Sequence, residues 1–205
     1  MHPRWIAGVD GVARLDDGPL VYANALPAQG MTAEENPHQS RGGRRIVGGH
    51  RSCACRGGAQ PAVSAWLSFE HRAHMREGQH VLVLGATSVT GALAVQLAKA
   101  AFGAVRVVAA GRNAARLEWL QTVGADAVIP LEAKDLAMRV AAQHRVQPFD
   151  VVLDYLWGSP AEQVLAALGN VDPNASFHVT RFVQIGEMGR PEYHPSGRNF
   201  TQRGN

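Results

Sequence analysis

The clearest pattern in the chain is an apolar run over residues 81–84 that ends in small residues at 85–91, followed by an alanine-rich amphipathic segment at 92–99. The unbroken apolar run predicts a strand buried on both faces, and the amphipathic segment predicts a helix. A tight turn between them places free backbone amides and the positive end of a helix dipole together, which favours a pyrophosphate. The pattern therefore predicts the strand, turn and helix of a nucleotide site.

More apolar runs follow at regular spacing, with helical segments between them. Strands are predicted at 104–110, 127–129, 149–154 and 181–186, and helices at 113–123, at 135–143 and from Ser159 onward. Asn113 and Ser159 are suited to cap the helices that they begin, and Gly124 is suited to end the first of these helices. Strands that alternate with helices of this length predict an α/β fold with a doubly wound parallel sheet of the Rossmann type.

The turn supplies the first candidate cofactor-binding residues. All of its positions are assigned to that role: Gly85, Ala86, Thr87, Ser88, Val89, Thr90 and Gly91. A dinucleotide fingerprint needs small residues for the tight turn, for the approach of the pyrophosphate and for helix packing, and these positions are Ala86, Ser88 and Gly91 here. Because Ser88 brings a side chain to the point of approach, Ser88→Gly is expected to tighten binding, although the hydroxyl could itself donate to a phosphate oxygen.

The end of the second strand of the parallel sheet indicates which dinucleotide to expect. Sites specific for NAD place an acid there to bind the ribose 2′-hydroxyl, whereas arginine accommodates the 2′-phosphate of NADP. The chain carries Gly111, Arg112, Asn113 and Arg116 in this region, with no acid among them. NADPH is therefore the expected cofactor, and these four residues are assigned to its binding. The alternative is that both arginines are solvated residues at the start of a helix.

The nicotinamide end of the cofactor is expected beyond the fourth and fifth strands. In an open α/β sheet the reactive part of a ligand lies outside the carboxyl ends of the strands. Tyr155 and Gly186 follow these two strands and are assigned to the cofactor site. A tyrosine in this position more often packs with its hydroxyl satisfied than donates a proton, so no catalytic residue is assigned.

Residues 78–188 resemble the cofactor domain of the medium-chain dehydrogenase/reductase superfamily, in its zinc-independent quinone-oxidoreductase-like branch. The matching segments are residues 85–91, 124–129, 149–154 and 183–186. The resemblance implies an NADPH-dependent oxidoreductase that transfers hydride to a small quinone or carbonyl-conjugated substrate, chiefly by positioning it. The alternative is a catalytically inactive NADPH-binding fragment or a pseudogene product, because relatives continue with a sixth strand. The sheet edge left without that strand could recruit a partner, such as a second copy forming a homodimer.

The resemblance also divides the chain into parts. Residues 1–60 are expected to be a degenerate remnant of the relatives' GroES-like β domain, 61–188 the NADP-binding domain and 189–205 an irregular tail. Paired glycines and few large aliphatic side chains predict irregular backbone without a core over 23–60. We interpret this segment as the translation of a shifted reading frame.

Composition and charge exclude several other functions. The net charge of the 205 residues is +3, and the arginine-rich segment 23–60 accounts for this excess, so the cofactor domain is not part of a basic field for nucleic acid. No apolar run reaches membrane-spanning length and the N-terminus lacks a signal peptide, which predicts a cytoplasmic protein. Cys53 and Cys55 are too few for a disulfide framework, and with His50 they lack a fourth ligand, so no metal site is expected.

Overall fold

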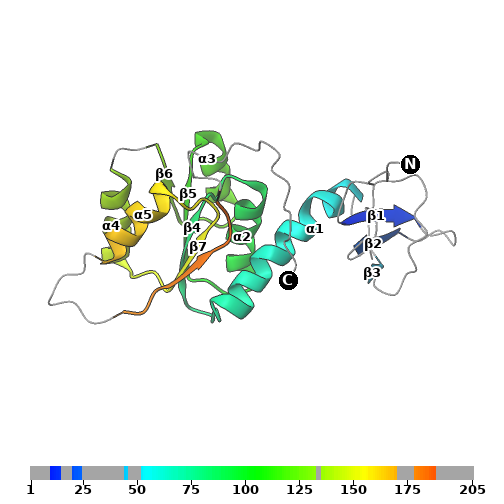
Figure 1. Cartoon of the computed structure of the whole chain (residues 1–205), viewed down its shortest axis with the longest axis horizontal. Coiled ribbons are helices and arrows are strands. Elements are labelled where there is room, and N and C mark those ends of the chain that lie inside the picture. Colours follow the sequence, from blue (N-terminus) through cyan, green and yellow to red (C-terminus); the bar gives the residue numbers. More distant parts are fainter. Residues whose placement is uncertain are drawn as a thin grey trace, which may run out of the picture. The chain divides into compact units, whose positions relative to one another are not determined.

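The computed structural model describes residues 10–14, 20–24, 44–45, 52–132, 135–169 and 178–187. Its contacts divide the chain into two units, Met1–Trp66 and Leu67–Asn205. The described part of the first unit holds a three-stranded antiparallel sheet (Figure 1). Its strands are, in spatial order, β1 (Asp10–Arg14), β2 (Leu20–Asn24) and β3 (Arg44–Arg45).

A long helix, α1 (Ser52–Leu67), crosses the boundary between the units in sequence, and Ser68–Arg72 continues it as a π-helical turn. β3 and the first half of α1 lie inside 23–60, where irregular backbone was predicted. The helix extends back from its apolar second half because a residue added to an existing helical turn generally gains one hydrogen bond, although Pro61 inside the helix has no N–H to donate. The end of β2 also falls in this segment, whereas residues 25–43 and 46–51 and the expected tail 189–205 lie outside the described residues.

The second unit is built on a parallel sheet whose strand order is β6-β5-β4-β7-β8. The strands are β4 (His80–Leu84), β5 (Arg106–Gly111), β6 (Ala127–Pro130), β7 (Val151–Asp154) and β8 (Arg181–Gln184). Every neighbouring pair in this sheet runs parallel. The predicted doubly wound parallel sheet is therefore confirmed, with strand ends displaced by at most two residues from those that the sequence predicted.

Four helices cover the two faces of this sheet (Figure 1). They are α2 (Val89–Ala100), α3 (Ala114–Thr122), α4 (Leu136–Val146) and α5 (Ser159–Gly169). One face buries alternate strand residues against α4 and α5, and this cluster includes Leu82, Leu84, Val108, Val152, Leu136, Val140 and Val164. The intervening residues Val81, Val83 and Val107 are also fully buried. Burial on both faces explains why the central strands have apolar runs rather than alternating patterns.

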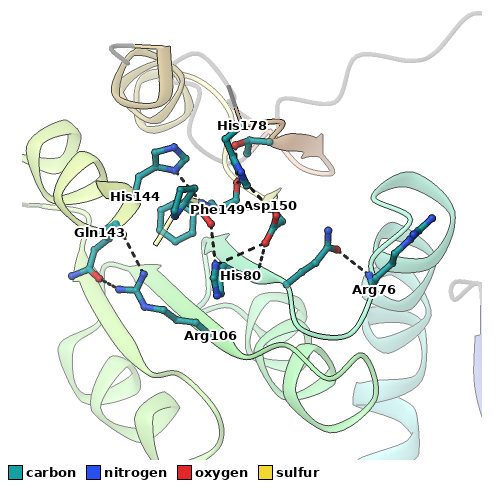
Figure 2. Close-up of polar contacts among 11 residues, drawn as sticks. Arg76, His80, Arg106, Gln143, His144, Phe149, Asp150 and His178 are labelled. Carbon is teal, nitrogen blue, oxygen red and sulfur yellow. Dashed lines mark hydrogen bonds and ion pairs between the residues drawn. The ribbon is translucent and has the colours of Figure 1, made fainter. Parts of the chain in front are cut away.

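The amino-terminal edge of the sheet holds a polar cluster (Figure 2). Asp150 Oδ2 accepts a hydrogen bond from the backbone N–H of His80 at 2.8 Å, and His178 Nε2 lies 3.4 Å from Asp150 Oδ1. His144 Nδ1 accepts the backbone N–H of Phe149 at 3.0 Å. A histidine nitrogen can accept only while it carries no proton, so the contact that fixes the start of β7 depends on neutral His144.

Acidification is expected to weaken the hydrogen bond between Phe149 and His144. Burial, and secondly the nearby His178, hold the pKa of His144 below its ordinary value of 6.5. Because the pKa is lower in the folded than in the unfolded protein, unfolding takes up a proton in this range. The stabilising contribution is complete above pH 6.5 and is lost as the pH falls toward the folded pKa. We expect the free energy of unfolding to fall by about 0.5 kcal/mol between about pH 7 and pH 5, a value reduced for the partial exposure of the ring.

Urea unfolding at a series of pH values measures this effect. His144→Asn is the matched variant, because its amide oxygen can accept the N–H of Phe149 but does not titrate. The variant should show a flatter pH dependence between about pH 7 and pH 5. An identical profile in both proteins contradicts the role given to His144.

Candidate cofactor site

The strand order of the parallel sheet reverses at one point. The chain leaves β4 toward β5 and β6 on one side, whereas β7 and β8 lie on the other side of β4. The switch point is therefore between β4 and β7, and ligands of open α/β sheets bind outside the carboxyl ends of the strands at such a point. The predicted site residues all lie at this edge: 85–91 after β4, Gly111 at the end of β5 with Arg112, Asn113 and Arg116 after it, Tyr155 after β7 and Gly186 after β8.

The turn after β4 is fixed by hydrogen bonds to the neighbouring strand. Gly85 adopts a left-handed backbone with φ of +80°, and the N–H groups of Gly85 and Ala86 both donate to the carbonyl of Ala110 at 2.9 Å. The N–H of Ser88 donates back to the carbonyl of Gly85 at 3.0 Å. The turn that links β4 to α2 is thus fixed to the carboxyl end of β5.

Ser88 is the N-cap of α2. Its Oγ accepts the N–H of Gly91 at 3.0 Å and donates to the carbonyl of Gly85 at 2.8 Å. The hydroxyl proton is therefore engaged within the turn, and donation to a phosphate would compete with this bond. The cap therefore occupies the N–H of Gly91. The N–H groups of Val89 and Thr90, in the first turn of α2, are then the ones that the helix N-terminus can offer to an anion.

Gly91 is the point where α2 touches the turn. A Cβ at Gly91 would lie 2.4 Å from the carbonyl oxygen of Gly85 and 2.7 Å from the Cα of Ala86. These are backbone atoms and cannot rotate away. Gly91 therefore has the helix-packing role that the sequence predicted for the last position of the fingerprint.

The end of β5 lies under the same turn. A Cβ at Gly111 would lie 2.4 Å from Cγ2 of Thr87, so this side chain covers the strand end. Asn113 caps α3 as predicted, with its Oδ1 accepting the N–H of Arg116 at 3.0 Å. Arg112 and Arg116 are exposed, and within the described residues neither guanidinium forms an ion pair. Both are free to meet an anion beside the turn.

The loop after β7 is organised by Asp154, which the sequence places near the nicotinamide but without a binding role. Asp154 is completely buried, and its Oδ1 accepts the N–H groups of Leu156 at 2.9 Å and Trp157 at 3.1 Å. Burial raises the pKa of this carboxyl, while the two backbone hydrogen bonds oppose the shift. An acid at the end of a buried apolar strand is a signal that the sequence offers for this role, since such an acid needs partners to be tolerated there.

Trp157 holds a strained conformation in this loop. Its φ is +55°, in the left-handed region that disfavours residues with a Cβ. We expect Trp157→Gly to be more stable than Trp157→Ala by about 1 kcal/mol, because both variants lose the same indole and only glycine adopts this backbone freely. Denaturant unfolding of the two variants measures the difference, and equal stability would show that the backbone relaxes.

Tyr155 differs from the sequence expectation in one respect. Its ring is packed, with 7% of the residue exposed, but its hydroxyl is buried without a hydrogen-bond partner in the described structure. Burial raises the pKa of the Tyr155 phenol. Gly186 lies against it, since the N–H of Gly186 donates to the carbonyl of Asp154 at 3.2 Å and a Cβ there would meet the carbonyl oxygen of Tyr155 at 2.3 Å.

The chain is similar in sequence to known dehydrogenases and quinone reductases. The family described as zinc-binding dehydrogenase matches residues 90–177. The probable NADPH-dependent quinone reductase tdiC of Emericella nidulans is 33% identical over 150 residues, which cover 69% of this chain and 40% of that protein. The chain belongs to the medium-chain dehydrogenase/reductase superfamily. Within that superfamily it falls on the quinone-oxidoreductase-like branch, as the sequence predicted.

Two solved structures show the same fold. The quinone oxidoreductase of Thermus thermophilus, whose structures include a complex with NADPH, matches with a TM-score of 0.75 and 27% identity over 93% of this chain and 57% of that one. An alcohol dehydrogenase superfamily protein from Novosphingobium aromaticivorans matches with a TM-score of 0.72 and 24% identity over 92% of this chain and 57% of that chain. The present chain thus spans 40% of the curated relative and 57% of these two solved chains.

The matched family is named for zinc binding, which raises the question of whether this chain has a group of metal ligands. Among the residues that the structure describes, no three His, Cys, Asp or Glu side chains are grouped to hold a metal ion. His50 and the side chains of Cys53 and Cys55 lie outside that part.

None of the helices in the described ranges has the length and apolar character of a membrane-spanning segment.

Proposed function

We propose that the chain binds NADPH at the switch point between β4 and β7 and reduces a small quinone or carbonyl-conjugated substrate. The observation that carries this proposal is the capped turn at 85–91, which is fixed by backbone hydrogen bonds and presents a helix N-terminus. Arg112 and Arg116 follow the neighbouring strand β5 and are exposed, with no ion pair to any residue that the structure describes. A dinucleotide with a pyrophosphate and a 2′-phosphate fits both features. The relatives named for NADPH-dependent quinone reduction support the same interpretation.

Each group at the carboxyl edge has a proposed part in binding. The turn and the first-turn amides of α2 would hold the pyrophosphate, and Arg112 and Arg116 would hold the 2′-phosphate by charge-assisted hydrogen bonds. Asn113 holds the start of α3 in place, and Gly111 lets Thr87 close over the end of β5. The loop after β7 and Gly186 would border the nicotinamide half.

When bound, NADPH supplies a hydride from C4 of its nicotinamide, and a proton from solvent completes the reduction of the acceptor to a quinol or saturated carbonyl. The residues described contribute orientation at the switch point. Asp154 orients the loop after β7 through its backbone hydrogen bonds, and no side chain is assigned an acid–base step. We further propose that the reaction needs no metal ion and takes place in the cytoplasm.

Steady-state oxidation of NADPH in the presence of 1,4-benzoquinone tests the proposal. The absorbance of NADPH should fall only with protein and quinone together, and faster with NADPH than with NADH. A reaction without protein corrects for direct reduction of the quinone. Binding of NADPH without turnover would support the alternative of an inactive binding chain, and absence of binding would contradict the proposed function altogether.

A further inference from the structure

Tyr155 stands at the switch point itself. Its N–H donates to the carbonyl of Leu84 at 3.2 Å and so extends the pairing of β7 with β4. A Cβ at Gly85 would lie 3.2 Å from the Cβ of Tyr155. The glycine turn after β4, Tyr155 after β7 and Gly186 after β8 thus lie side by side at the edge where ligands of such sheets bind.

The hydroxyl of Tyr155 is an exception among the described side chains. It is the single buried side-chain nitrogen or oxygen atom in the described part of the chain that has no hydrogen-bond partner. Such an atom is costly, because its hydration is lost and nothing replaces it. The shift of the Tyr155 pKa above its ordinary value, caused by burial, keeps the phenol protonated at neutral pH. The group is therefore a hydrogen-bond donor that the described protein does not use.

We propose that the hydroxyl of Tyr155 donates a hydrogen bond to an oxygen of the nicotinamide riboside half of the cofactor. This inference rests on the proposed binding of NADPH. The arginines that would hold the 2′-phosphate follow β5, and the turn that would hold the pyrophosphate follows β4. A dinucleotide laid across these strands reaches β7 with its nicotinamide half. Tyr155 is the first residue after β7, so it meets this half and not the adenosine.

Tyr155→Phe in the full chain tests this role, with affinity measured by calorimetry and stability by thermal unfolding without ligand. We expect the dissociation constant for NADPH to rise about tenfold, the effect of one lost hydrogen bond to a buried acceptor. Adenosine 2′,5′-bisphosphate lacks the nicotinamide riboside, so its affinity should not change. The melting temperature without ligand should not fall, because the variant removes a hydroxyl that has no partner.

Thr180→Val is the matched control, since it deletes a hydroxyl at the opposite edge of the sheet. Thr180 Oγ1 donates to the carbonyl of Phe149 at 2.6 Å, so this variant should melt at a lower temperature and bind NADPH unchanged. The inference is overturned if Tyr155→Phe binds NADPH as the wild type does, or if both ligands weaken equally. If the unaltered chain binds neither ligand, the proposed function fails before this inference is reached.

Discussion

Gly91→Ala is expected to abolish measurable NADPH binding and to lower the free energy of unfolding by about 3 kcal/mol. The added methyl would lie 2.4 Å from the carbonyl oxygen of Gly85 and 2.7 Å from the Cα of Ala86. Neither atom can move without breaking the bonds that tie Gly85 and Ala86 to the carbonyl of Ala110. The substitution therefore displaces the turn that would receive the pyrophosphate, and it strains the packing of α2 on the sheet.

Gly169→Ala provides the matched control for this variant. Gly169 is the last residue of α5, and a Cβ there meets nothing within 4 Å. The control should bind NADPH as the wild type does and unfold at equal or slightly higher denaturant concentration, because alanine favours helix more than glycine. Calorimetry and urea unfolding measure both variants. Normal NADPH affinity in Gly91→Ala would mean that the turn is not the pyrophosphate site.

Arg112→Glu is expected to weaken NADPH binding about 100-fold while changing NADH binding by about threefold or less. A charge-assisted hydrogen bond contributes about 1.5–3 kcal/mol, and the new carboxylate would also repel the 2′-phosphate. NADH lacks this phosphate, so it reports effects of the substitution on the rest of the site. The ratio of the two affinities is therefore the quantity that the variant should change.

Arg145→Glu reverses the same charge elsewhere in the second unit. Arg145 is exposed in the last turn of α4, which lies near the start of β7 at the opposite edge of the sheet. Its reversal should leave the ratio of NADPH to NADH affinity unchanged, since exposed charges at this range are screened. Fluorescence titration with both nucleotides gives the two ratios. Equal losses for NADPH and NADH in Arg112→Glu would refute the assignment of the 2′-phosphate to this arginine.

The sequence predicted the strands, turns and helix caps whose formation depends mainly on neighbouring residues. The apolar run at 81–84 and the small residues after it are enough to indicate a buried strand and a tight turn, because both depend on neighbouring residues. Asn113 was likewise predicted as a cap from its own chemistry and position, and the structure places its side chain on the N–H of Arg116. The parallel order of the sheet follows from alternating strands and helices.

Other features depend on contacts between distant segments and leave no local pattern. His80 meets Asp150, and Thr87 lies over Gly111, only because the strands pair in this order. Trp157 has a left-handed backbone, against the preference of the residue itself, and its N–H donates to the buried carboxylate of Asp154. The unpartnered hydroxyl of Tyr155 could not be foreseen either, since a phenol after a strand usually finds a partner as the chain packs.

The central claim is that the switch point between β4 and β7 binds NADPH, and calorimetric titration of the full chain with NADPH tests it most directly. The account predicts a single saturable site, and a melting temperature that rises as NADPH is added; at a hundredfold excess over the dissociation constant the stabilisation should reach about 2.7 kcal/mol. Absence of both binding heat and thermal protection at millimolar NADPH would contradict it.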